Sequence, residues 1–117
     1  MNQREKGMAG EEIARTYLKK QGYRILTTNF RLRNMAEIDV IAMDKDVLAF
    51  VEVKMRTSNK AGSGREAVTK TKQQHIRLAA SYYLQKNKVT DVFCRFDVLE
   101  ITAMGEDTAI ELIKNAF

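Results

Sequence analysis

Two acidic residues and a lysine lie inside apolar segments of residues 36–56. Asp39 belongs to the first apolar segment, and Glu52 and Lys54 belong to the second, on either side of Val53. A short polar turn separates the two segments, as expected for a pair of strands. Asp, Glu and Lys are rarely buried without partners, because an unpaired charge there costs several kcal/mol. A shared divalent cation is the simplest explanation for all three.

Strand periodicity predicts which of these side chains share a face. Side chains two residues apart in a strand point to the same side, so Glu37 and Asp39 are expected on one face of the first strand. Ile38 and Val40 are then expected on the opposite face. By the same rule, Glu52 and Lys54 are expected to share one face of the second strand. The flanking residues are apolar, so both strands are predicted to be central and buried on both sides.

This combination suits hydrolysis of a phosphodiester. Such a site must hold a metal that polarises the phosphate and lowers the pKa of the attacking water. Mg²⁺ prefers oxygen ligands and keeps several waters, so Asp39, Glu52 and the backbone carbonyl of Val53 are sufficient ligands for Mg²⁺ or Mn²⁺. Lys54 can orient the water or stabilise the charge that develops in the transition state.

A purely structural alternative is open for each of these residues. Lys54 could form a buried ion pair with Glu52 or Asp39, although buried pairs are seldom the best way to stabilise a sheet. Glu37 could be an auxiliary acid of the site, or it could pair with Lys54 or Arg95.

Composition is compatible with a polyanionic partner but does not require one. The chain has 117 residues, with 20 Lys and Arg against 15 Asp and Glu, for a net charge of +5. This length predicts one domain over residues 1–117 with a single core. The single cysteine allows no disulfide within the chain and fits a reducing cytoplasm. Without a membrane-spanning apolar stretch, we expect no membrane association.

Local patterns predict seven elements in the order α-β-β-β-α-β-β, which is an α/β mixed sheet with helices on its faces. A loop long enough to cover a ligand is expected at 57–67. For the last element a strand is favoured over a short helix. The predicted elements are helices at 7–21 and 70–87, and strands at 23–31, within 36–56 (two strands), at 92–101 and at 108–113.

Basic residues cluster near the predicted strand and helix ends. They are candidates for a surface that binds the nucleic-acid backbone, although each could equally be a solvated charge. His75 is expected on the helix surface, with phosphate contact as its functional alternative. Glu11 lies near the start of the first helix, where the helix dipole favours an acid. The candidate backbone-binding residues are Arg31, Arg33, Arg56, Lys70, Lys72 and Arg77.

Motifs along nearly the whole chain resemble those of the small, uncharacterised bacterial YraN family. That family in turn resembles the PD-(D/E)xK nucleases, and in particular the characterised archaeal Holliday-junction resolvases. The matching motifs are GxxGExxAxxYL (7–18), GYxILxxNFR (22–31), EIDVIA (37–42), FVEVKxR (50–56), AVTxxKQ (67–73) and RFDV (95–98).

The resemblance implies a restriction-endonuclease-like core, with a central mixed sheet of about five strands between two helices, and metal-dependent cleavage of DNA. Asp39 and Glu52 would be metal ligands, and Lys54 the catalytic lysine. Glu11 would complete the metal site from the first helix. Gln73 would be an auxiliary polar residue on the second helix.

Two departures from the family pattern leave the ligands intact. Met35 and Ala36 replace the glycine pair that usually precedes the EID motif, and the chain contains no proline. We therefore expect a Mg²⁺- or Mn²⁺-dependent endonuclease acting on branched or structured DNA, with a homodimer pairing two sites. The alternative is a nucleic-acid-binding module that keeps the fold without turnover. A partner role directed at RNA is a third hypothesis.

Overall fold

The computed structural model describes residues 3–56 and 68–117, with side chains from residue 10 onward. The loop predicted at 57–67 lies outside the described residues. The predicted order α-β-β-β-α-β-β is confirmed. The elements are α1 (Gln3–Lys20), β1 (Arg24–Leu32), β2 (Ala36–Asp44), β3 (Val47–Arg56), α2 (Lys70–Lys86), β4 (Phe93–Met104) and β5 (Asp107–Ile113).

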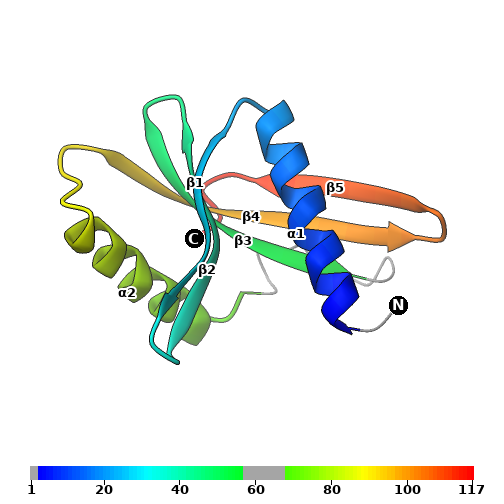
Figure 1. The fold of residues 1–117 in the computed structure, drawn as a ribbon, viewed down its shortest axis with the longest axis horizontal. Helices are drawn as coiled ribbons and strands as arrows, with labels where there is room; N and C mark the ends of the chain where they lie inside the picture. Colours follow the sequence, from blue (N-terminus) through cyan, green and yellow to red (C-terminus); the bar gives the residue numbers. More distant parts are fainter. Residues whose placement is uncertain (1–2, 57–67) are drawn as a thin grey trace.

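The strands form one mixed sheet in the order β1-β2-β3-β4-β5. Only β3 and β4 are parallel; the other neighbours in the described sheet are antiparallel. A parallel pair needs a crossover connection, and α2 lies in the segment that joins these two strands. The sheet is strongly twisted, so that β1 and β2 run vertically in Figure 1 while β4 and β5 run horizontally.

Local chemistry explains where α1 ends and where α2 begins, whereas α1 begins at Gln3, before the predicted start at residue 7. Gly22 follows α1 with a φ of 93°, a left-handed conformation that suits glycine and stops the helix. Thr69 caps α2, because its hydroxyl accepts a hydrogen bond of 3.2 Å from the Lys72 amide. None of the described helices has the length and apolar character needed to span a membrane.

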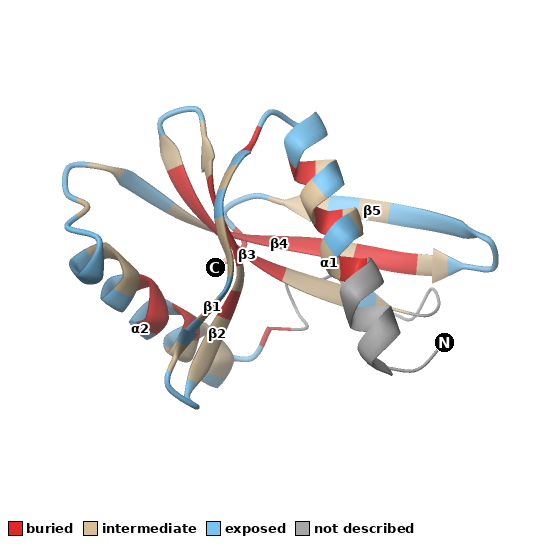
Figure 2. Ribbon diagram, viewed as in Figure 1, coloured by how far each residue is buried: buried red, intermediate tan, exposed pale blue. Residues whose placement is uncertain are grey.

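Each helix closes a hydrophobic cluster on its own face of the sheet. The alternating side chains of β3 divide between the two clusters: Leu48 and Phe50 pack on the α2 side, and Ala49 and Val51 on the α1 side. Figure 2 shows the buried residues concentrated in the middle of the sheet and on the inward faces of the helices. The prediction that β3 is buried on both sides is confirmed.

β2 departs from the predicted alternation. Ile38 packs in the α2 cluster and Val40 in the α1 cluster, although these residues were expected on the same face. On the neighbouring β1, Asn29 has a φ of 53° and lies between the residues that pair with Val40 and Ile38. A left-handed residue in one strand bends and twists the pair locally. Simple period-two alternation therefore fails at Asp39, between these two residues.

Candidate functional site

The site begins where β2 and β3 stop pairing with each other. Their antiparallel register runs from Asp44 opposite Val47 to Val40 opposite Val51 and goes no further. Beyond that point Asp39 Oδ2 accepts a hydrogen bond of 2.7 Å from the backbone amide of Val53. The side chain thus replaces the strand partner that the Val53 amide has lost. This bond fixes a carboxylate in the opening between the two strands.

Glu52 provides the second carboxylate of the site and is only 5% exposed. Its Oε1 atom lies 2.8 Å from Lys72 Nζ and 4.0 Å from Lys54 Nζ. Its Oε2 atom is buried and has no hydrogen-bond partner among the described residues. Buried polar atoms are normally satisfied, so an unpartnered carboxylate oxygen is a position where a ligand would be stabilising.

Burial and neighbouring charges shift the pKa values of Asp39, Lys54 and Lys72. Burial raises the pKa of Asp39 to about 7, and the nearby Glu52 charge adds to the effect. Burial and the neighbouring Lys72 ammonium lower the pKa of Lys54. For Lys72 burial acts to lower the pKa, but the Glu52 carboxylate and other neighbours raise it overall. Clustered perturbations of this kind are typical of functional sites.

Asp39 lines two cavities, one on each side of the opening. A cavity of about 180 Å³ on the α1 side is bounded by Glu11, Asp39 and Val53, among others. Glu11 and Asp39 therefore line the same cavity, and the metal-ligand role that the family resemblance implies for Glu11 stays a prediction. Gly10 allows α1 to approach β3, because a Cβ atom there would lie 2.8 Å from the Sδ atom of Met55.

The second cavity, of about 170 Å³, lies toward α2. Glu37, Asp39, Glu52, Lys72 and His75 contribute to its lining. His75 was expected on the helix surface, and the structure places it at this cavity. The sequence carried a signal for Lys72 and His75 only in their position near the start of the helix. Their proximity to Glu52 depends on how α2 packs against the sheet.

The remaining predicted auxiliary residues have local partners. Glu37 pairs with Arg31 at 3.5 Å, and neither of the partners weighed for it, Lys54 or Arg95, takes that place. Gln73 Nε2 donates a hydrogen bond of 2.9 Å to the carbonyl of Val68, which secures the start of α2.

The predicted backbone-binding residues occupy four environments. Arg31 and Arg33 line the turn between β1 and β2, and Lys70 is exposed at the start of α2 near Lys72. Arg56 instead pairs with Glu100 at 3.3 Å. The guanidinium of Arg77 lies 4.6 Å from the centre of the Phe96 ring. Met35 of the turn and Lys72 of α2 both line the second cavity, so the turn and the start of α2 meet there.

The donor set fits a hard divalent cation with few protein ligands. The described residues contain no group of three or more His, Cys, Asp or Glu side chains arranged to hold a metal. Mg²⁺ usually binds through one or two carboxylates and keeps several waters, so Asp39 and the unpartnered Oε2 of Glu52 match its preferences. Val53 contacts Asp39 through its amide; the ligand role of its carbonyl stays a prediction.

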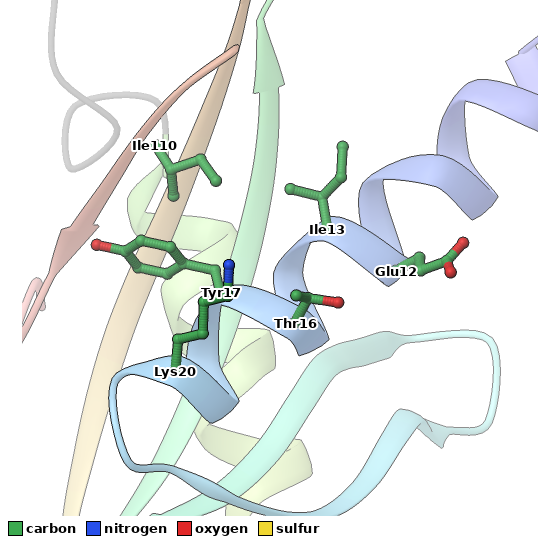
Figure 3. A pocket seen from close by; sticks show the side chains of 6 residues that line it. All are labelled: Glu12, Ile13, Thr16, Tyr17, Lys20 and Ile110. Carbon is green, nitrogen blue, oxygen red and sulfur yellow. The ribbon is translucent and has the colours of Figure 1, made fainter.

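A separate cavity lies between α1 and β5, away from these residues. Its volume is about 330 Å³, larger than either cavity beside Asp39. Figure 3 shows Ile13, Tyr17 and Ile110 around it, with Glu12, Thr16 and Lys20 also in its lining. None of the predicted site residues lines it. Its chemistry is that of a mostly apolar groove, without converging carboxylates.

Comparison with known proteins places the chain in a family. The model of the uncharacterised protein family UPF0102 matches residues 10–101, which include α1 from Gly10 onward, the opening between β2 and β3, and α2. The chain belongs to the UPF0102 family. The resemblance to YraN proteins is confirmed by this match.

UPF0102 relatives are similar along their whole length. A UPF0102 protein of Caldicellulosiruptor saccharolyticus is 47% identical over 119 residues, covering all of both chains. One of Acetivibrio thermocellus is 47% identical over 121 residues, covering 99% of this chain and 93% of the relative. One of Geobacter metallireducens is 47% identical over 111 residues, covering 95% of this chain and 90% of the relative.

Proposed function

We propose that this UPF0102 protein is a Mg²⁺- or Mn²⁺-dependent endonuclease that hydrolyses phosphodiester bonds in DNA. The observation that carries the proposal is that charged side chains of β2 and β3 lie together in the opening between these two strands. Asp39 accepts from the Val53 amide at the point where β2 and β3 separate, and Glu52 presents a buried, unpartnered oxygen beside two lysines. The two lysines lie against Oε1 of Glu52, so its buried Oε2 is left available to a ligand.

Each side chain has a role that follows from its position. Asp39 and Glu52 hold the metal, with Glu11 reaching the same region from α1. The metal, when bound, polarises the scissile phosphate and lowers the pKa of a bound water. Lys54 lies beside Glu52 with a lowered pKa, so it can position the attacking water and stabilise negative charge in the transition state.

Positive charge at the site supports a nucleic-acid substrate. Arg31 and Arg33 line a hollow at the β1–β2 turn that shares Met35, Ala36 and Glu37 with the second cavity. These arginines, and exposed Lys70 at the start of α2, would contact backbone phosphates. The preference for branched or structured DNA, and a homodimer that presents two sites, follow from the resemblance to resolvase-like nucleases. We place this activity in the cytoplasm, in keeping with a lone free cysteine.

A cleavage assay tests the proposal directly. Labelled single-stranded, duplex, flap and four-way-junction DNAs would be incubated with Mg²⁺ or Mn²⁺ and with Glu52→Gln or Lys54→Met. Glu111→Gln, at an exposed residue of β5, is the matched control for the acid. We expect cleavage of at least one DNA by the wild type and by the control, and its loss in both site variants.

The same assay separates the enzyme from a binding module. Salt-sensitive DNA binding without cleavage, unchanged by Glu52→Gln, would replace the proposal with a nucleic-acid-binding module that lacks turnover. A parallel panel of RNA substrates distinguishes DNA from RNA as the target. Cleavage that persists in Glu52→Gln would contradict the assignment of this site.

A further inference from the structure

The ion pair between Lys72 and Glu52 joins α2 to the metal-binding strand. Lys72 Nζ lies 2.8 Å from Glu52 Oε1, whereas Lys54 Nζ lies 4.0 Å from the same atom. Glu52 is nearly buried, with a side chain 6% exposed, so its charge is costly without a partner. In the metal-free protein Lys72 therefore carries most of the compensation for this carboxylate.

A divalent cation at the same carboxylates would make this cluster too positive. The cluster holds two lysines, Lys54 and Lys72, beside Asp39 and Glu52, and the proposed site adds Glu11 as a third acid. Glu37 also lines the cavity, but its charge is paired with Arg31. Adding two positive charges while both ammonium groups stay in place would leave uncompensated cations at close range. One ammonium group must then move away from Glu52, toward solvent or a negatively charged ligand.

The structure indicates which lysine can move. The Lys72 side chain is 42% exposed, whereas that of Lys54 is 23% exposed and belongs to a central strand. Lys72 also lies in the first turn of α2, a turn with no acidic residue. A cation is unfavourable at this end of a helix, where the dipole is positive, but it suits a place where an anionic ligand binds.

We propose that Lys72 is an exchangeable counter-ion: it neutralises Glu52 in the metal-free protein and, once the metal binds, is released to contact a phosphate of the nucleic acid. This inference rests on the proposed function of the site. It couples two binding events, because the metal makes a phosphate-binding cation available. In the metal-free protein, Lys72 stays paired with Glu52 and is not available to a phosphate.

Metal affinity provides the first test. Mn²⁺ would be titrated calorimetrically into the wild type, Lys72→Met, Glu52→Gln and the control Lys70→Met, which alters an exposed lysine of the same helical turn. We expect Lys72→Met to bind Mn²⁺ about tenfold more tightly, since the metal no longer displaces a charged hydrogen bond. Lys70→Met should match the wild type.

Chemical labelling provides the second test and uses the intact chain. Lysine acetylation followed by mass spectrometry should show that Mn²⁺ increases the labelling of Lys72 but not that of Lys70. With the wild type, added duplex DNA that carries cleavage-resistant phosphorothioate linkages should protect Lys72 again when Mn²⁺ is present. Increased labelling without protection by DNA would overturn the phosphate contact.

The two proposals fail in different ways. If Mn²⁺ binds in a manner that depends on Glu52, but Lys72→Met binds it no more tightly than the wild type, the counter-ion role is wrong and the metal site stands. If Mn²⁺ does not bind to the wild type, or binds equally well to Glu52→Gln, both the metal site and the counter-ion role of Lys72 are wrong.

Discussion

Asp39 Oδ2 accepts a 2.7 Å hydrogen bond from the backbone amide of Val53, at the point where β2 and β3 cease to pair. The bond joins the two strands that supply the candidate site. It satisfies an amide that has no partner strand on that side, and it holds a carboxylate in a position where burial disfavours its charge.

Two substitutions of Asp39 should separate these two effects. Asp39→Asn keeps an acceptor oxygen for the Val53 amide, whereas Asp39→Ala leaves that amide unsatisfied. We expect Asp39→Ala to be less stable than Asp39→Asn by about 1–3 kcal/mol, the cost of an unpaired buried polar group. Urea unfolding at roughly neutral pH measures the difference in the free energy of unfolding between the two variants. Equal stability of the two variants would show that the bond contributes nothing.

The raised pKa of Asp39 predicts how stability depends on pH. The pKa of Asp39 is about 7 in the folded protein against an ordinary value of 3.8, so the folded state binds the proton more tightly than the unfolded state. Ionised Asp39 therefore lowers stability most above pH 7, and the penalty disappears as pH falls toward 3.8. Asp39→Asn should raise the melting temperature at pH 8, with a gain that shrinks by pH 5. A gain that does not vary with pH would contradict this origin.

Metal binding should reverse the cost of the clustered charges. A cation held by Asp39 and Glu52 stabilises only the folded state, so Mn²⁺ at about 100 times its dissociation constant should raise the melting temperature by about 10 °C. Glu52→Gln should lose most of this shift. Glu111→Gln, on the exposed part of β5, should keep it. Differential scanning fluorimetry with and without EDTA provides the measurement.

A second network of charged residues should matter for stability. Fully buried Asp97 accepts hydrogen bonds from the Tyr23 hydroxyl at 2.9 Å, from Arg95 Nε at 2.8 Å and from the Asn115 amide at 3.0 Å. Arg95→Met removes the cation from a buried carboxylate, and we expect a loss of about 3–5 kcal/mol. Tyr23→Phe removes one neutral donor and should cost about 1–2 kcal/mol. Urea denaturation of both variants measures the loss of unfolding free energy in each. A larger loss in Tyr23→Phe than in Arg95→Met would contradict this prediction.

Acid should weaken the same network. The hydrogen bond from Arg95 is the main cause that lowers the pKa of Asp44, and Lys114 acts in the same direction. A pKa that is lowered in the folded state contributes stability above the unfolded pKa, and this contribution is lost as pH falls below the ordinary value of 3.8. Asp44→Asn should therefore narrow the stability difference between neutral pH and pH 3, about one unit below that value, in urea titrations.

The sequence by itself determined the elements and the facing of β3. Apolar side chains at helical or strand spacing specify local structure, so the order α-β-β-β-α-β-β and the strand after Met104 followed from short-range pattern. Glu52 and Lys54 share a face because a strand repeats every two residues, and the structure confirms their proximity.

Tertiary structure alone decided how the site is assembled. The opening between β2 and β3, the different clusters of Ile38 and Val40, and the contact of Lys72 with Glu52 depend on twist and on packing between distant segments. Periodicity carries no information about such contacts, because it describes one element at a time. Residue types and spacing therefore predicted the carboxylates and the lysine, whereas their partners were set by where α1 and α2 pack on a twisted sheet.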